Sequence, residues 1–235
     1  MTTRDDFSFQ PEHFSGVARL FPLPDLVLFP HVMQPLRIFE RRYRELLEDA
    51  LADDGLIAMA LLKPGWEADY EGQPPLEPVV CLGRVLTHCR LPGGQYNIFL
   101  LGLQRAVICQ ELPRTRSFRR AQVRLLPDRC SRAAAAARPA LRRELLELFQ
   151  RLLPPAVEFQ EELEPLLRKQ LSLGALTDII AFTMRGDVLT KQQLLGERDV
   201  DERARLLLSF LRAQDSDAEA VGSSCFAFPP DFSPN

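Results

Sequence analysis

A proline-punctuated stretch near the start of the chain decides the fold: Leu20-Phe-Pro-Leu-Pro-Asp-Leu-Val-Leu-Phe-Pro30, followed closely by Pro35-Leu-Arg-Ile-Phe-Glu-Arg-Arg-Tyr43. Four prolines punctuate its apolar runs: Pro22, Pro24, Pro30 and Pro35. Because proline fixes φ and removes a backbone donor, these residues are expected to set sharp strand ends. The stretch therefore predicts short buried strands that lead into a helix.

The helix is predicted over residues 39–52, where the hydrophobic period changes. Apolar residues recur there at i, i+4, i+7, i+8, i+11 and i+12, and charged residues cover the opposite face. One apolar stripe on a helix is typical of a helix that packs on a sheet. We expect Phe39, Tyr43 and Leu47 to hold this helix against the strands.

Strand-like apolar runs surround this motif, at residues 17–23, 56–62, 79–91, 95–112 and 119–126. Pro92-Gly93-Gly94 separates the two longest runs and predicts a hairpin. Gly83 and Gly102 interrupt those two runs and indicate bulges or bends, and at Gly102 a side chain is expected to block the bend. The Pro- and Gly-rich residues 63–78 predict a long loop.

From Pro127 onward the pattern becomes helical. Helices are predicted at residues 133–153, 159–171, 173–183, 190–195 and 199–212. Segregated strands and helices indicate the α+β class, here a β-rich lobe with one helix followed by a C-terminal helical bundle. The expected organisation is a flexible leader, a β-rich lobe, a helical subdomain and a disordered tail, at residues 1–16, 17–127, 128–213 and 214–235.

Composition narrows the function. Of 235 residues, 46% are hydrophobic, and 29 Lys and Arg against 32 Asp and Glu leave a net charge of −3. This balance predicts no global attraction to nucleic acid or to an anionic membrane. No apolar run approaches the roughly 20 residues of a membrane helix, and no signal-peptide core is visible. Five widely spaced cysteines favour reduced thiols and a cytoplasmic location.

Charge is nevertheless concentrated locally. The segment from Arg114 to Arg143 holds ten arginines against Asp128 alone, a local charge of +9, so the rest of the chain carries −12. One interpretation is a phosphate-binding strip for nucleic acid. The other is a solvated face that pairs with acidic residues elsewhere, such as Glu158, Glu161, Glu162 and Glu164. Only Phe118 offers aromatic stacking, which favours the second interpretation.

Signatures of catalysis are missing from the sequence. It has no GxxxxGK[ST] phosphate loop, no GxSxG and no HExxH. Three histidines stand apart from one another: His13, His31 and His88. None has a partner at metal-ligand spacing, so no metal or cofactor is expected. A Ser–Lys dyad needs a buried lysine beside a serine. No burial is expected for any of the three lysines, Lys63, Lys169 and Lys191.

Several of these motifs together resemble the N-terminal, substrate-binding domain of Lon proteases. The opening prolines and helix are followed in order by Gly83-Arg-Val, Leu91-Pro-Gly-Gly94, Gly102-Leu-Gln-Arg105 and the helical residues 176–208. The resemblance covers residues 17–212 and implies a PUA-like pseudo-barrel followed by helices. It assigns structural roles to eight residues: Pro22, Pro35, Phe39, Glu40, Tyr43, Gly83, Gly102 and Arg105.

In full-length Lon, ATPase and Ser–Lys protease domains follow this region. The motifs of both are missing here, so the chain resembles the stand-alone bacterial form, and no enzyme activity is expected. The implied function is binding of unfolded or extended polypeptides, as an adaptor or chaperone-like module that could serve a protease or ATPase. Neither a membrane partner nor nucleic acid is favoured, and weak self-association is left open.

Two hypotheses concern individual residues. An apolar run broken by proline is expected to form an exposed rim that contacts polypeptide, at Phe29, Pro30, His31 and Met33. Glu40 and Arg105 are charged residues within apolar motifs, and we expect them to pair between helix and hairpin. Two alternative functions also stay open: a nucleic-acid-binding module that uses the Arg114–Arg143 segment, and a hydrolase with an unrecognised site.

Overall fold

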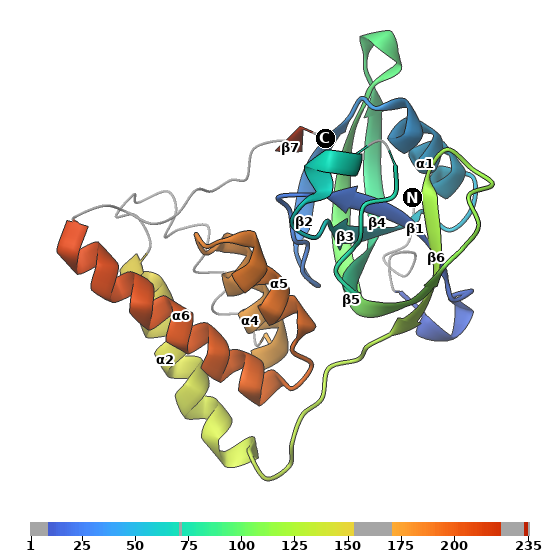
Figure 1. Cartoon of the computed structure of the whole chain (residues 1–235). Helices are drawn as coiled ribbons and strands as arrows, with labels where there is room; N and C mark the ends of the chain where they lie inside the picture. The colour runs from blue at the N-terminus through green and yellow to red at the C-terminus, as the bar shows by residue number, and fades with distance from the viewer. Residues whose placement is uncertain (1–8, 71, 153–170, 222–232, 235) are drawn as a thin grey trace, which may run out of the picture.

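The structure is a computed structural model that describes residues 9–70, 72–152, 171–221 and 233–234. A β-rich lobe and a helical lobe lie side by side (Figure 1). The strands are β1 (Val17–Leu23), β2 (Met33–Ile38), β3 (Leu56–Leu61), β4 (Val79–Arg90), β5 (Tyr96–Glu111), β6 (Arg119–Leu125) and β7 (Ser233–Pro234). The α-helices are α1 (Arg41–Leu51), α2 (Arg138–Leu152), α4 (Leu173–Thr183), α5 (Val188–Gly196) and α6 (Val200–Val221). The described segments thus confirm the predicted α+β class.

Five strands close into a barrel. The hydrogen-bonded order is β4-β3-β1-β6-β5, and β5 pairs back onto β4, so that each strand has two neighbours. Strands β1 and β3 are parallel, and the other pairs in the ring are antiparallel. Small side chains suit the narrow interior, which is lined by Ala18, Leu20, Leu56, Ala58, Ala60, Val80, Leu82, Ala106, Ala121 and Val123.

A second buried cluster covers the outside of the barrel and continues into the helical lobe. Helix α1 packs there through its apolar stripe, so Tyr43 and Leu47 are buried as predicted. Phe39 lies before the helix and is 42% exposed, so the expectation that it pins α1 is wrong.

Strand β2 was not predicted, because Pro35 lies inside it. It pairs with the first half of β5, from Met33 opposite Leu101 to Ile38 opposite Tyr96. Proline is tolerated in a strand whose far side is open, because the missing N–H breaks no ladder there. The expectation that Pro35 ends a strand is therefore wrong.

Pro22 also lies inside a strand, β1, where it pairs with Ala60 of β3. Pairing of β1 with β6 stops at Leu20, so position 22 does not need to donate a hydrogen bond to a strand on that side. The Pro22 carbonyl instead accepts a 2.9 Å hydrogen bond from the Tyr43 hydroxyl. Pro22 thus joins the barrel to α1 rather than ending the strand.

Tyr43→Phe is expected to lower the free energy of unfolding by about 1–2 kcal/mol, the usual cost of leaving a buried acceptor unpaired. The ring would keep its stack on Phe21, whose centroid lies 4.3 Å away. Urea unfolding followed by circular dichroism measures the change. An unchanged midpoint would show that the Pro22 carbonyl finds another donor.

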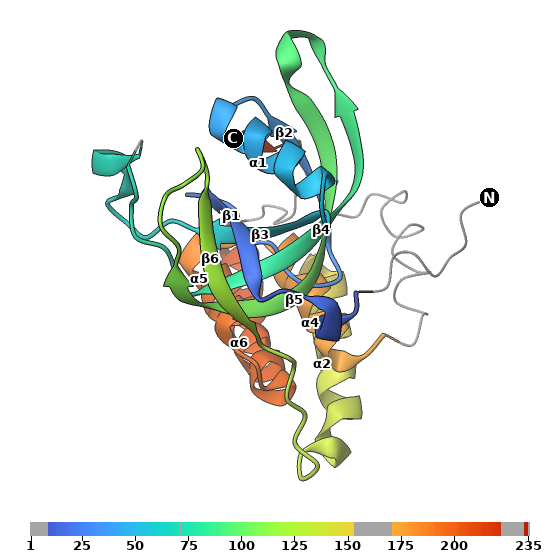
Figure 2. The same cartoon turned by 90° about the vertical axis from the view of Figure 1, so that its right-hand side faces the viewer.

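The predicted hairpin is present, and Figure 2 shows its β4 and β5 arms extending beyond the barrel. A register shift follows Leu82, so that Gly83 faces Gly102 across the two strands. A Cβ on Gly102 would lie 1.9 Å from the Phe29 carbonyl oxygen. Glycine is needed at this position because the chain before β2 crosses β5 at backbone contact distance.

The helical lobe begins after the connection at residues 126–137 and runs α2, α4, α5, α6 in the described residues. Ser172 caps α4 by accepting from the Ala175 N–H, and Asp187 caps α5 in the same way at Thr190. The helix predicted at 159–171 falls almost wholly outside the described residues. Helix α6 continues to Val221, so the boundary placed at residue 213 falls within a helix.

Candidate functional site

A buried cluster of charges joins the two lobes. The Arg105 guanidinium, on β5, donates to both Asp178 oxygens, on α4, at 2.5 and 3.0 Å, and through Nε to the Leu195 carbonyl at 2.8 Å. Arg105 is 2% exposed and Asp178 is fully buried. Burial alone would lower the pKa of Arg105, but the charge and hydrogen bonds of Asp178 raise it above its usual value.

A second arginine completes this cluster, hereafter the interlobe charge cluster. Arg203 on α6 donates to both oxygens of Asp128 at 2.6 and 3.0 Å, and its Nε lies 3.3 Å from Asp178. Two arginines thus face two aspartates, and the cluster is neutral. Bidentate ion pairs of this kind fix the relative orientation of their partners, so the cluster holds the two lobes in one arrangement.

The predicted pair between Glu40 and Arg105 does not exist. The Glu40 carboxylate instead accepts from Arg42 at 2.8 Å and from the Tyr70 hydroxyl at 2.7 Å, at the start of α1. Both charged residues are paired, as their apolar surroundings require, but with different partners. Asp178 lies 73 residues after Arg105, and no local sequence signal links the two.

A cavity of about 240 Å³ opens above the interlobe charge cluster. Its lining consists of Pro30, His31, Leu103, Gln104, Arg105, Leu126, Pro127, Asp128 and Asp178. The charged groups in the cavity wall already pair with one another. The cavity is therefore an opening between the lobes, and these charges are not available to bind a ligand. It does bring two predicted contact residues, Pro30 and His31, beside the lobe junction.

The predicted contact residues divide into two groups. Phe29 and Pro30 are buried, so the expectation of an exposed rim is wrong for them. The His31 N–H donates to the Gly102 carbonyl and the Gly102 N–H to the Val32 carbonyl, both at 2.8 Å, so the backbone after Phe29 and Pro30 is held against β5. His31 is exposed at a positive φ of 66°, and Met33 is 50% exposed.

Met33 belongs to an apolar side of the β2–β5 ribbon that we call the outer face, in which Met33 and Phe99 are exposed, Leu101 is half-buried and Pro35 is buried. Register places Met33 opposite Leu101 and Pro35 opposite Phe99, so all four side chains share one side of the β2–β5 ribbon. Phe99 is 36% exposed. The opposite side of the ribbon is buried under α1 and includes Leu36 and Leu100.

The outer face adjoins an open edge of β2. Strand β5 occupies one side of β2, and on the other side the described residues show pairing with β7 alone, at Leu36 with Ser233 and Arg37 with Pro234 (Figure 1). This side is called the β2 edge. An exposed strand edge presents main-chain donors and acceptors that can bind another extended chain. Sequence reasoning predicted an exposed sheet edge that could bind a peptide strand, but could not assign it to β2, because β2 was not predicted.

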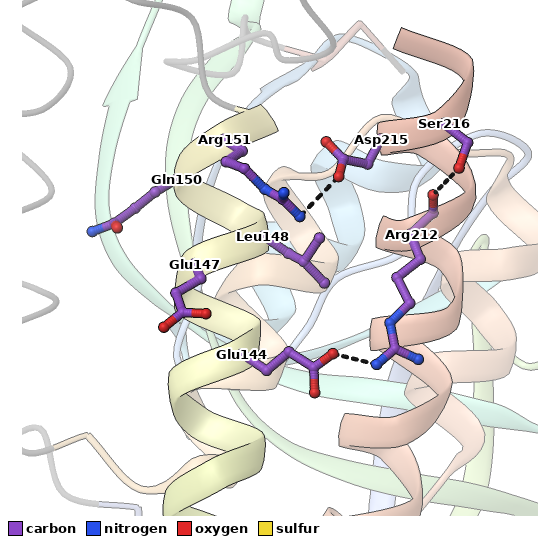
Figure 3. Close-up of a pocket in the computed structure, with 8 residues that line it drawn as sticks. All are labelled: Glu144, Glu147, Leu148, Gln150, Arg151, Arg212, Asp215 and Ser216. Atoms are coloured by element: carbon purple, nitrogen blue, oxygen red, sulfur yellow. Dashed lines mark hydrogen bonds and ion pairs between the residues drawn. The ribbon is translucent and has the colours of Figure 1, made fainter. Parts of the chain in front are cut away.

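A hollow of about 730 Å³ lies between α2 and α6 (Figure 3). Two ion pairs cross it, Arg151 to Asp215 at 2.9 Å and Arg212 to Glu144, above the buried Leu148. Glu147 also lines the hollow, so three acidic side chains face two basic ones. Charged side chains therefore dominate the walls of this groove, unlike the outer face.

The arginine-rich segment 114–143 is spread over both lobes, from the loop before β6 to α2. Arg116, Arg119 and Arg138 form ion pairs with Asp49, Glu111 and Asp201. The acidic partners proposed at 158–164 lie outside the described residues. Since the segment bends across two lobes, its charge does not gather on one element.

Lys191 differs from the expectation that no lysine is buried. It is half-buried, burial lowers the pKa of its ammonium, and its Nζ donates to the Phe182 carbonyl at 2.8 Å. Among the described residues no hydrogen bond joins Lys191 to a serine hydroxyl, and Ser172 serves as the cap of α4. Burial of this lysine therefore comes without the partner that a Ser–Lys dyad requires.

Two further searches cover only the described ranges. They contain no group of three or more His, Cys, Asp or Glu side chains placed to hold a metal ion. No helix in those ranges combines the length and the apolar character needed to cross a membrane. Cys81, Cys89, Cys109 and Cys130 are all free thiols.

Known structures share this fold. The N-terminal domain of the Mycobacterium avium complex Lon protease superposes with a TM-score of 0.66 at 19% identity, over 83% of this chain and 98% of that one. The Lon N-terminal domain protein from Xanthomonas campestris superposes over the same shares with a TM-score of 0.57 at 20% identity.

Sequence relatives point the same way. The Lon proteases of Dictyoglomus thermophilum and Heliobacterium modesticaldum are 27% and 26% identical to it, over 86% and 82% of this chain. The chain spans about a quarter of the length of these curated relatives, 25% and 23%. The family model of the ATP-dependent protease La (LON) substrate-binding domain matches residues 17–213. The protein therefore belongs to the family of the Lon substrate-binding domain.

Proposed function

We propose that this chain is a non-catalytic module that binds extended, apolar segments of protein substrates at the outer face and the β2 edge. The observation that carries the proposal is the exposure of Met33 and Phe99 directly beside a strand edge that already accepts an extended segment. Family membership supports the substrate class, because the family is named for substrate binding.

The geometry favours an extended ligand. In β-augmentation the main chain of the ligand bonds to a strand edge, while alternate side chains contact the adjoining face. The β2 edge supplies the first kind of contact, and the outer face supplies the second. A segment of alternating apolar residues would satisfy both, which is the chemistry of an unfolded polypeptide rather than of a nucleic acid.

The remaining part of this proposal rests on the family match. Similarity to the substrate-binding domain of Lon supports a module that presents polypeptides to an ATPase or protease. The four free cysteines support work in a reducing cytoplasm.

Met33→Asp is expected to weaken binding of a fluorescein-labelled, Val- and Phe-rich peptide about tenfold, because a carboxylate must be desolvated against the apolar ligand. Fluorescence anisotropy at constant salt measures the dissociation constant. Since Met33 is half exposed, the thermal midpoint is expected to stay within a few degrees of the parent value.

Leu189→Asp provides the matched control, because Leu189 is also 50% exposed but lies on α5 in the helical lobe. The proposal requires that this variant bind the peptide as the parent does. Equal losses of peptide affinity for Met33→Asp and Leu189→Asp would show nonspecific hydrophobic binding instead of a site. Unchanged binding for Met33→Asp would remove the outer face from the proposal.

A further inference from the structure

Resting on the proposed function, we infer that residues 222–235 of the chain itself occupy the β2 edge and compete there with polypeptide substrates. The described part of this segment, β7, lies parallel to β2 and pairs Ser233 with Leu36 and Pro234 with Arg37. It is therefore an intramolecular occupant of the same edge that the proposed substrate would use.

The register of β7 follows from the chemistry of β2. Pro35 has no N–H, and its carbonyl already accepts a 2.7 Å hydrogen bond from the Gln34 side chain. Main-chain groups at this position are thus withdrawn from the edge. Pairing with β7 begins at Leu36, directly after the blocked position, which indicates that free backbone groups of β2 select where a strand binds.

The segment also has the composition of a substrate. Residues 222–235 read Gly-Ser-Ser-Cys-Phe-Ala-Phe-Pro-Pro-Asp-Phe-Ser-Pro-Asn, with Phe226, Phe228 and Phe232 among them. Its three prolines disfavour a helix and favour an extended backbone. A Phe-rich segment continuous with β7 has the apolar composition that the outer face beside the β2 edge would bind.

Tethering makes such an occupant effective. Eleven residues, 222–232, separate the end of α6 from β7. A short tether holds its ligand at an effective concentration on the order of 1 mM, so a segment that alone binds with a dissociation constant of about 0.1 mM weakens substrate binding about tenfold. Substrates with higher affinity would displace it, and weak ones would be rejected.

The test compares the full chain with a chain that ends at Val221, which retains α6 and its buried leucines. The shortened chain is expected to bind the labelled Val- and Phe-rich peptide about tenfold more tightly. A synthetic peptide of residues 222–235 is expected to displace that probe from it. The same peptide with its three phenylalanines replaced by serine serves as the control and is expected not to compete.

A full-length variant with Phe226, Phe228 and Phe232 all replaced by serine is expected to show the same gain, and it guards against misfolding of the shortened chain. Equal probe affinity in all three proteins, with no binding of the 222–235 peptide, would overturn the inference. If the shortened chain binds the 222–235 peptide but not the probe, the edge occupant is supported and the proposed substrate site fails.

Discussion

Arg105→Met is expected to lower the free energy of unfolding by about 3–5 kcal/mol, the range measured when one partner of a buried ion pair is removed. Asp178 would remain fully buried with only Arg203 Nε, at 3.3 Å, as a charged neighbour. The Leu195 carbonyl would lose its donor as well. Since Arg105 joins β5 to α4 and α5, the helical lobe is expected to lose its fixed place on the barrel.

Urea unfolding followed by both near- and far-ultraviolet circular dichroism measures this loss. Arg105→Met/Asp178→Leu is expected to recover part of it, because Arg203 and Asp128 then remain as a neutral pair. Arg41→Gln is the surface control, since its pair with Glu45 is exposed to solvent and contributes little to stability. A cost below 1 kcal/mol for Arg105→Met, judged against the scatter of such measurements, would contradict the role given to the interlobe charge cluster.

Gly102→Ala is expected to destabilise the chain by about 3 kcal/mol or more, at the upper end of overpacking costs. The new Cβ would lie 1.9 Å from the Phe29 carbonyl oxygen, where backbone must move to make room. Movement would break the two 2.8 Å hydrogen bonds that join Gly102 to His31 and Val32. The Phe29 ring would then leave its position in the core.

Gly196→Ala is the matched control, because nothing lies within 4 Å of a Cβ at the end of α5. It is expected to be neutral or to stabilise by up to about 1 kcal/mol, through the entropy of the unfolded chain. Thermal unfolding of both variants separates crowding from the general effect of losing a glycine. Similar midpoints for the two would refute the close approach at Gly102.

Much of the architecture can be predicted from local sequence patterns. The apolar runs at 17–23 and 56–62, the Pro92–Gly94 turn and the helical stripe under Tyr43 each report their own structure through burial period and turn chemistry. Strand β2 was not predicted, because Pro35 lies within it and proline in a sequence usually indicates the end of a strand. Proline breaks a strand only where a neighbour needs its N–H, and which side of β2 stays open depends on the finished sheet.

The candidate site shows the same division. Exposure of Met33 agreed with the expected rim, but Phe29 and Pro30 are buried, and the backbone that follows them, at His31 and Val32, is hydrogen-bonded to Gly102. Residues close together in the sequence thus differ in exposure, since Phe29 and Pro30 are buried and Met33 is exposed. Only strand pairing brought Phe99 next to Pro35 and made an apolar face.

What the sequence by itself determined is the class of fold, the family and the preference of each residue for core or water, since these follow from side-chain chemistry and short-range periodicity. Tertiary structure alone decided the partners. Arg105 needed a carboxylate wherever it was buried, but its choice of Asp178 over Glu40 depends on how two lobes pack across 73 residues of chain. Long-range pairing is set by the packing of whole elements, which no local pattern records.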